Sequence, residues 1–299
     1  MLSSLAALAL AFALDAAVAE PPGRVHPVAL YGRAVTALDR EWSVPRFTGV
    51  VVALALPLAA AALAALTVVG AGRVHLGVAT ALAGLWVFAT TSRRMLVDLA
   101  SDVVARIDAA DDATHTRIRG LVGRDTSDLS DGELRSAAVE SAAENLADGL
   151  VAPLLAFAVG AQASLALGVA AAVWVKAVNT HDSVLGYPSK PHGTASARLD
   201  DLVMWVPARV SAALVALAAL DPGALARARA WAGAPPSPNS GWPMATLAAA
   251  LDVRLEKPSV YTLNPDAALP TTVDAERGVR LVDRACVLAF GVSGVVAWL

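Results

Sequence analysis

Six apolar stretches along the chain are long enough, or nearly long enough, to cross a lipid bilayer, which takes about 20 predominantly apolar residues. The composition agrees, since 57% of the 299 residues are hydrophobic and only 16% are charged. The sequence therefore predicts an all-α, polytopic integral membrane protein. It would have about five transmembrane helices and cytoplasmic helical loops, in a single membrane-embedded domain over residues 1–299. The stretches are Leu2 to Ala19, Thr48 to Val69, Val74 to Thr90, Leu150 to Val178, Val203 to Leu220 and Arg280 to Leu299.

Two of these stretches leave alternatives open. Ala17-Val-Ala19 resembles a signal-peptide cleavage site, but no Lys or Arg precedes Arg24, so we expect the first stretch to be retained. Leu150 to Val178 would be about 43 Å long as a straight helix, which is too long for one upright span. It is one tilted helix, two short limbs or a re-entrant pair.

The polar segments between the apolar stretches are rich in arginine. By the positive-inside rule, Glu20 to Phe47 and Ser92 to Gly149 are predicted to be cytoplasmic. Within the second segment, Met95 to Ala109 has the pattern of an amphipathic helix, and Ser130 with Glu133 forms a capping box that starts another.

Prolines mark two places where regular helix is expected to stop or bend. Pro207 is expected to kink or end its helix near Arg209. The proline-rich stretch from Ala234 to Pro243 is expected to be a rigid connector.

Several functional classes are excluded by composition. The net charge of −3 and the pI of about 5.9 give no basic signature for nucleic acid. The single cysteine excludes a disulfide framework and a cysteine metal site, and the five histidines have no zinc-ligand spacing. The chain also lacks the glycine-rich Walker A loop, so any nucleotide is held in another way.

Three acidic residues, Glu140, Glu144 and Asp148, are spaced four apart just before an apolar stretch. On one α-helix they would form a single stripe of carboxylates, which repel one another. Unpaired charge is costly at the edge of a membrane. A metal ion, a basic substrate or arginines from elsewhere must therefore compensate, and we take these three as candidate catalytic residues.

Asp and Arg residues also gather in the polar segments. Arginine suits bidentate binding of phosphate or carboxylate, and aspartates suit Mg²⁺, which takes a few carboxylates together with substrate phosphates. The structural alternative is that Arg124–Asp125 and Arg198–Asp201 are local ion pairs, which contribute little in solvent.

Five short motifs occur in a fixed order, each at a membrane boundary. They are His26-Pro-Val28 with Gly32; Val122-Gly-Arg-Asp-Thr126; Ala138-Val-Glu-Ser-Ala-Ala-Glu-Asn145 followed by Asp148-Gly149 and Ala152-Pro153; Asn179-Thr-His-Asp-Ser183 with Ala197-Arg-Leu-Asp-Asp201 and Pro207-Ala-Arg209; and Ser237-Pro-Asn-Ser-Gly241. With these motifs the chain resembles, over nearly its whole length, the CobD/CbiB family, the adenosylcobinamide-phosphate synthases of cobalamin biosynthesis. It departs from the family pattern at Ala19-Glu20-Pro21, at Glu256-Lys257 before Tyr261, and at Trp205.

The resemblance implies an ATP-dependent ligase that forms a C–N bond. It would join adenosylcobyric acid to (R)-1-aminopropan-2-yl phosphate or ethanolamine phosphate and give adenosylcobinamide phosphate. ATP and Mg²⁺ would be required, and the protein would lie in the cell membrane with its active-site loops on the cytoplasmic side, where it could meet later enzymes of the pathway. The reaction needs an activated carboxylate, a bound phosphate and an ammonium that loses a proton.

The resemblance also suggests roles for particular residues. Glu140, Glu144 and Asp148 would bind the amine or Mg²⁺, with Glu144 as the general base. Candidates for binding substrate and phosphate are His26, Arg124, Asn145, Asn179, Ser183, Lys190, Arg198, Arg209, Asn239 and Ser240. Candidates for Mg²⁺ are Asp125, Asp182, Asp200 and Asp201.

Two other classes of protein stay open. A transporter or membrane binding protein would place the three acids at mid-bilayer depth, lining an ion path. A structural subunit of a biosynthetic complex would leave the polar motifs without a common pocket. Because the acids precede the apolar stretch, the sequence favours an enzyme at the membrane interface.

Overall fold

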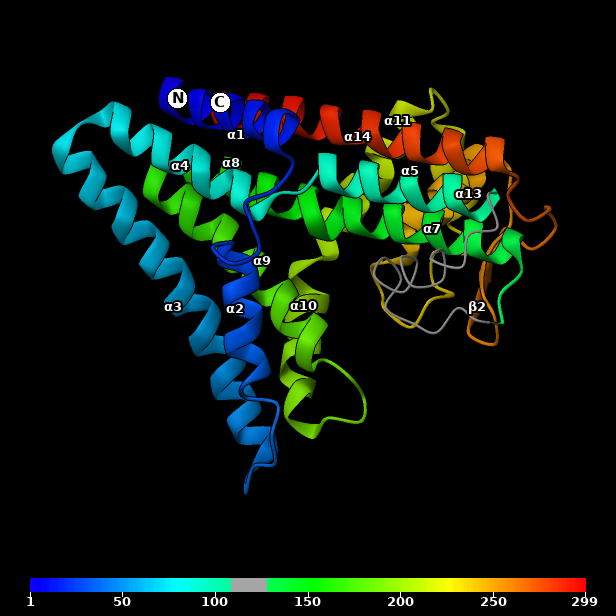
Figure 1. Ribbon diagram of the computed structural model, residues 1–299, viewed down its shortest axis with the longest axis horizontal. Coiled ribbons are helices and arrows are strands. Elements are labelled where there is room, and N and C mark those ends of the chain that lie inside the picture. The colour runs from blue at the N-terminus through cyan, green and yellow to red at the C-terminus, as the bar shows by residue number, and fades with distance from the viewer. Residues whose placement is uncertain (109–127) are drawn as a thin grey trace. The chain divides into compact units, whose positions relative to one another are not determined.

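The computed structural model describes residues 1–108 and 128–299, and helices make up most of them (Figure 1). The chain folds as two compact units, each made of segments that lie far apart in the sequence. Unit 1 consists of Met1–Ser92, Asp148–Met204 and Phe290–Leu299, and unit 2 of Arg93–Ala147 and Trp205–Ala289. The all-α fold is confirmed, whereas the single domain over residues 1–299 stays a prediction.

Unit 1 contains most of the apolar helices. Its elements are α1 (Leu2–Val18), α2 (Pro27–Thr36), α3 (Pro45–Val74), α4 (Leu76–Thr90), most of the π-helix η1 (Ala147–Val151), α8 (Ala152–Ala161), α9 (Leu165–Leu185), the 3-10 helix η2 (Pro191–Gly193) and α10 (Thr194–Val203). Local signals set where they begin, since His26, His75 and Ser164 cap α2, α4 and α9 with their side chains.

Unit 2 contains the remaining helices and a small β-hairpin. Its elements are α5 (Arg94–Asp108), α7 (Asp131–Leu146), α11 (Trp205–Ala218), α12 (Gly223–Ala228), α13 (Gly241–Leu251), β1 (Leu255–Lys257), β2 (Tyr261–Leu263) and most of α14 (Thr272–Trp298). The two strands pair antiparallel, with Leu255 opposite Leu263 and Lys257 opposite Tyr261. The predicted capping box is confirmed, since Ser130 N–H donates to Glu133 Oε2 at 2.8 Å.

The core of unit 1 forms where α3 packs against α9 and α4. Small side chains on one side of α3 let the neighbouring backbones approach closely, as in membrane helix pairs. Its opposite side exposes large apolar residues, including Leu58 and Leu66, which suits contact with lipid. The buried residues of α3 are Gly49, Ala53, Pro57, Ala61, Ala64 and Val68.

The long apolar stretch from Leu150 to Val178 forms two helices rather than one. The chain turns after Ala161, and Ser164 then caps α9, which packs back along α8. Gly160 and Gly168 lie at this contact, where a Cβ on either would come within 3 Å of backbone carbonyl oxygen. The structure thus rules out the single tilted helix and agrees with two short limbs or a re-entrant pair.

Three helices in the described part of the chain are long and apolar enough to span a membrane: α3, the continuous stretch Asp131–Ala161, and α14. There are four if α10 and α11, separated only by Met204, form one broken span. This is fewer than the expected five or so, because α1 and α4 have only 17 and 15 residues. At 1.5 Å per residue they measure about 25 and 22 Å, less than the bilayer core.

Two local expectations were wrong. The helix does break close to Pro207, but at Met204, before the proline, rather than near Arg209; Pro207 lies in the first turn of α11, where its missing N–H costs little. The stripe of Glu140, Glu144 and Asp148 is also interrupted. Regular α-helix ends at Leu146, and Asp148 lies in η1, whose wider turn changes the spacing.

Candidate functional site

A group of buried and half-buried polar side chains in unit 1 lies around the polar end of α9. Lys176, Asn179 and Asp182 are spaced three apart on this helix, Asp148 comes from η1 and Asp200 from α10. These five residues are called the Lys176 cluster below. Two of its members, Asp182 and Asp200, are predicted Mg²⁺ ligands, and Asp148 is a predicted catalytic residue.

Asn179 connects two of the acids. Its Nδ2 donates to Asp200 Oδ1 at 3.5 Å, and the same side chain lies near the carboxylate of Asp148. Asn179 is only 7% exposed, so its amide is held in the interior beside the two half-buried acids.

Lys176 supplies the positive charge of the cluster. Its Nζ donates to the carbonyl oxygen of Asp148 at 3.3 Å, and its charge interacts with those of Asp148, Glu20 and Asp200. Our sequence analysis missed this residue. The available signal was a lone lysine near the end of a long apolar stretch, where charges usually mark function.

Glu20 and His26 lie at the edge of the cluster. Glu20 accepts a hydrogen bond from Ser92 Oγ at 2.8 Å, and His26 Nε2 lies 3.9 Å from Glu20 Oε2. Burial lowers the pKa of His26, against the opposing charge of Glu20, and its Nδ1 accepts from Val28 N–H at the start of α2. The predicted site residue His26 is therefore a helix cap beside the cluster.

Asp182 has the least satisfied carboxylate of the cluster. Its Oδ1 is buried and has no hydrogen-bond partner in the described part of the chain. Burial, together with the negative charges of Asp201 and Asp148, raises its pKa from 3.8 to about 6. A cation would relieve this repulsion.

The residues present fit Mg²⁺, although no three His, Cys, Asp or Glu side chains among the described residues converge as a complete metal site. Mg²⁺ does not need such a cage, because it usually takes one or two carboxylates and fills its remaining positions with water and substrate phosphates. The buried, unpartnered oxygen of Asp182 and the neighbouring Asp200 offer such ligands.

Asp182→Asn is expected to raise the melting temperature at pH 8, and this gain should shrink as the pH falls through about 6. The pKa of Asp182 is raised on folding, so the folded protein binds more protons than the unfolded chain between about pH 4 and 6, and stability decreases as the pH rises. Thermal unfolding of detergent-solubilised protein across this range measures the effect.

Asp39→Asn is the matched control with the opposite sign. The hydrogen bond from Lys190 lowers the pKa of Asp39, so this carboxylate stabilises the fold at neutral pH and stops doing so in acid. The variant should melt below wild type at pH 7 and approach it in acid. A gain for Asp182→Asn that does not change with pH would contradict the assignment.

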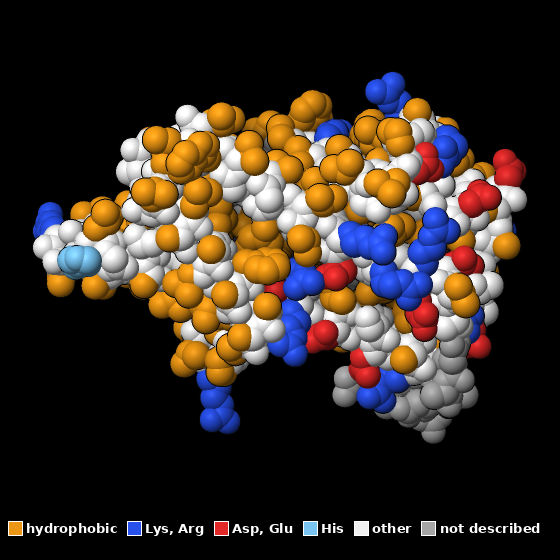
Figure 2. Space-filling view, turned by 90° about the horizontal axis from the view of Figure 1, so that it is seen from above, with side chains coloured by type: hydrophobic (Ala, Val, Ile, Leu, Met, Phe, Trp, Pro, Cys, Tyr) orange, Lys and Arg blue, Asp and Glu red, His pale blue; other side chains and the backbone are white. Residues whose placement is uncertain are grey.

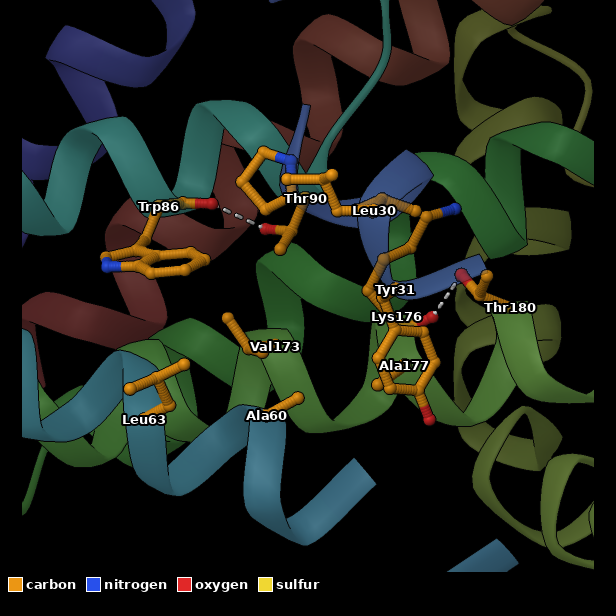
Figure 3. A pocket seen from close by; sticks show the side chains of 12 residues that line it. Leu30, Tyr31, Ala60, Leu63, Trp86, Thr90, Val173, Lys176, Ala177 and Thr180 are labelled. Atoms are coloured by element: carbon orange, nitrogen blue, oxygen red, sulfur yellow. Dashed lines mark hydrogen bonds between the residues drawn. The ribbon is translucent and has the colours of Figure 1, made fainter. Parts of the chain in front are cut away.

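An apolar cavity of about 350 Å³ lies next to Lys176, between α2, α3, α4 and α9. Figure 3 shows Leu63 and Ala60 of α3 below it and Trp86 of α4 beside it, with Tyr31 and Lys176 on the opposite side. Lys176 lines the cavity and is also a member of the Lys176 cluster, so the apolar cavity and the acidic cluster adjoin. This combination of apolar walls and a few polar groups is typical of ligand sites.

His181 stabilises the helices beside the cavity. Its Nδ1 lies 3.3 Å from the hydroxyl of Tyr31, which joins α9 to α2. Burial lowers the pKa of His181 to about 4, so the ring is neutral at physiological pH. We assign it a structural role.

Other predicted residues of unit 1 lie outside the cluster. Lys190 Nζ donates to Asp39 Oδ2 at 2.7 Å and to the carbonyl of Val184 at 2.9 Å. Ser183 Oγ donates back to the carbonyl of Asn179 at 2.9 Å. Arg198 is exposed, and its charge lowers the pKa that burial raises at Asp201, in keeping with the local pair expected from their spacing.

In unit 2, Glu140 joins α7 to the β-hairpin. It is 4% exposed, Ser136 Oγ donates to its Oε1 at 2.7 Å, and the Tyr261 hydroxyl donates to its Oε2. Ser136 Oγ in turn accepts from Glu256 N–H at 2.7 Å. Hydroxyl donors on both oxygens suit a positioning role better than a catalytic one.

Glu144 and Asn145, near the end of α7, are both half-buried. The Nδ2 of Asn145 donates to the carbonyl of Ser141 at 2.9 Å. Because Asp148 belongs to unit 1, unit 2 holds only two of the three predicted catalytic acids.

Arg209 holds the proline-rich connector of unit 2. Its Nη1 donates to Asn239 Oδ1 at 2.6 Å, and its guanidinium lies over the rings of Trp205 and Trp242, at 4.5 and 5.0 Å from their centres. Ser240 lies in the same turn, and its N–H donates to Ser237 Oγ at 3.5 Å. Arg209 thus contacts Asn239, which is followed directly by Ser240, and all three belong to unit 2. The predicted residues Arg124 and Asp125 lie outside the described residues.

Comparison with known proteins agrees with the motifs. A family model described as CobD/Cbib protein matches residues 8–288. A probable cobalamin biosynthesis protein CobD of Methanothrix thermoacetophila is 34% identical, over 97% of this chain and 95% of the relative. The cobalamin biosynthesis protein CobD of Pelobacter propionicus is 38% identical, over 85% and 80%. That of Klebsiella pneumoniae is 33% identical, over 94% and 90%. No solved structure matches the chain.

Proposed function

The chain belongs to the CobD/CbiB family and has a role in cobalamin biosynthesis, and on this premise we propose that it is an ATP-dependent acid–amine ligase. Its substrates are adenosylcobyric acid and an amino-alcohol phosphate, either (R)-1-aminopropan-2-yl phosphate or ethanolamine phosphate. The product is adenosylcobinamide phosphate. The active-site loops face the cytoplasm, where later enzymes of the pathway can receive the product.

One observation carries the proposal: buried carboxylates and a lysine lie beside an apolar cavity in unit 1. A corrinoid presents both a large apolar body and carboxylate chemistry, so its site needs both kinds of surface. The cavity offers the apolar wall, and Lys176 is a cation that can face a substrate carboxylate or phosphate.

The reaction has two steps, each of which forms one bond and breaks another. The propionate carboxylate attacks the γ-phosphorus of ATP, which gives an acyl phosphate and releases ADP. The amine then attacks the acyl carbon, the amide bond forms and inorganic phosphate leaves. Because an ammonium has no lone pair, it must lose a proton first, and Glu144 is the proposed base.

Mg²⁺ would be held by Asp182 and Asp200, with Asp148 and Asp201 close by, and would neutralise charge on the ATP phosphates. Asn179 hydrogen-bonds Asp200 and lies near Asp148. Glu140 positions α7 against the hairpin rather than taking part in proton transfer.

The test is synthesis of the amide by purified, detergent-solubilised protein. Adenosylcobyric acid, ATP and Mg²⁺ are supplied with one of the two amino-alcohol phosphates, and the product is identified by mass spectrometry. Product with one amine and not the other establishes the activity and the substrate. No product with either, from folded protein that binds corrinoid, would point to a carrier or scaffold.

Glu144→Gln tests the base. The variant should insert and fold but make no amide, because glutamine is similar in size and cannot accept the proton. A fully active Glu144→Gln protein would end this assignment while leaving the ligase activity in place.

A further inference from the structure

The first half of α14 has an exposed face that the proposed reaction does not use. Arg277, Arg280 and Arg284 are all exposed, and their spacing of three and four residues places them on one side of the helix. They are called the arginine stripe below. Figure 2 shows Lys and Arg side chains gathered beside hydrophobic ones on the face turned toward the viewer.

The arginine stripe is only weakly neutralised by its own helix. Arg280 Nη1 lies 3.4 Å from Glu276 Oε2, but both side chains are more than half exposed, so the pair is weak. In the described part of the chain, no acidic side chain pairs with Arg277 or Arg284 within 4 Å.

The other nearby acids already have partners. Asp274 accepts hydrogen bonds from Thr271 N–H and Oγ1 at 3.0 and 2.6 Å, at the start of α14. Asp283 pairs with Arg93 at 2.7 Å. The stripe therefore presents positive charge that anions from outside the chain can neutralise.

The stripe lies at the height of the lipid headgroups if α14 spans the membrane. From Arg284 the helix continues through the exposed Val287 to Trp298, a distance of about 21 Å. If Trp298 lies at the far membrane interface, the backbone of Arg284 lies inside the near interface of a core of about 30 Å. The long side chain of Arg284 covers the remaining distance to the near interface. Arg280 and Arg277 then follow outward, one and two turns farther from the core.

A hollow of about 400 Å³ between α5 and α14 adjoins the stripe. It is lined by Ser101 and Val104 of α5 and by Glu276, Arg280 and Asp283 of α14. Because Glu276 and Asp283 are acidic and only Arg280 is basic, the hollow itself does not favour anions, and the exposed arginines of the stripe carry the positive charge.

We propose that the arginine stripe binds the phosphate of anionic phospholipids on the exposed face of α14. The chemical class is a phosphodiester that carries a net negative charge, as in phosphatidylglycerol. Zwitterionic phosphatidylcholine has the same phosphate but no net charge, so the stripe distinguishes the two by charge.

Electron paramagnetic resonance of spin-labelled lipids tests this with the full chain in bilayers that contain both lipids. Spin-labelled phosphatidylglycerol should associate with the wild-type protein about threefold more strongly than spin-labelled phosphatidylcholine, and molar salt should reduce the ratio. The triple variant R277Q/R280Q/R284Q should bring it close to one.

The matched control removes three other exposed arginines, R24Q/R73Q/R229Q, and should keep the preference for phosphatidylglycerol over phosphatidylcholine.

If the stripe variant misfolds, Glu276→Gln provides a second test, because it removes the acidic partner of Arg280 and should raise the preference for phosphatidylglycerol. An unchanged preference in the stripe variant or in Glu276→Gln overturns the proposal. So does a stripe variant that loses binding of inorganic phosphate while keeping its lipid preference, since the site would then serve a soluble phosphate. Amide synthesis is measured separately, so failure here leaves the proposed reaction untouched.

Discussion

Lys176→Met is expected to lower the rate of amide formation by about a thousandfold or more, because preorganised charge is often the largest contribution to catalysis. Lys176 is the cation of its cluster, where it faces Asp148, Glu20 and Asp200 and forms part of the cavity wall. Methionine keeps much of the side chain's volume but removes the ammonium. The measurement is the amide formed per folded protein under saturating ATP and Mg²⁺.

Loss of the charge also leaves buried carboxylates without their counterion, which is destabilising by itself. Three comparisons separate the two effects. Thermal unfolding gives the loss of stability. Lys176→Arg keeps the charge with a different shape and should retain part of the activity. Lys257→Met, in the β-hairpin of unit 2, removes a lysine outside the cluster and should stay within a few-fold of wild type. A folded Lys176→Met protein with near wild-type activity would show that the Lys176 cluster is not the reaction site.

Much of the helical framework could be predicted because its signals are local. Apolar runs give α1, α3 and α4, the amphipathic pattern gives α5, and Ser130 with Glu133 gives the start of α7. Each depends on residues within one or two turns of each other, and a single sequence contains that information. Where the local signal was ambiguous, at Leu150 to Val178, the sequence could only leave alternatives open.

The site could be predicted only in part, because its contacts join distant segments. Lys176 meets Asp148 from 28 residues away, and Glu140 meets Tyr261 from 121 residues away. No local pattern connects such pairs. Taken alone, Lys176 looks like an isolated charge in an apolar run, and Glu140 looks like one step of an acidic stripe.

The acidic stripe also shows where a spacing argument fails. It assumed regular α-helix through Asp148, but the π-helix η1 intervenes and Asp148 falls in unit 1 with Lys176 and Asn179. π-Helical turns occur often at functional sites, where they redirect a side chain. Here the turn belongs to the segment that carries Asp148 into the cluster, so the failed prediction coincides with a candidate functional position.

Gly193→Ala is expected to lower the melting temperature by about 10 °C, from a loss of about 3 kcal/mol in stability. A Cβ on Gly193 would lie only 1.6 Å from the carbonyl oxygen of Leu185, and that backbone atom cannot rotate away. Leu185 is the last residue of α9, and Gly193 immediately precedes α10. The added methyl group must therefore push the start of α10 away from the end of α9.

This displacement should also reach the chemistry, because the hydrogen bond between Asn179 and Asp200 joins the same two helices. We expect Gly193→Ala to lose activity even at temperatures where it stays folded. The control is Gly70→Ala in α3, where no atom lies within 4 Å of an added Cβ. Alanine favours a helix over glycine by about 0.5–1 kcal/mol, so this variant should melt at or slightly above wild type. If Gly193→Ala melts like Gly70→Ala and keeps full activity, the close approach of η2 to α9 is not what holds the cluster together. The hydrogen bond between Asn179 and Asp200 would then not depend on the space that Gly193 leaves.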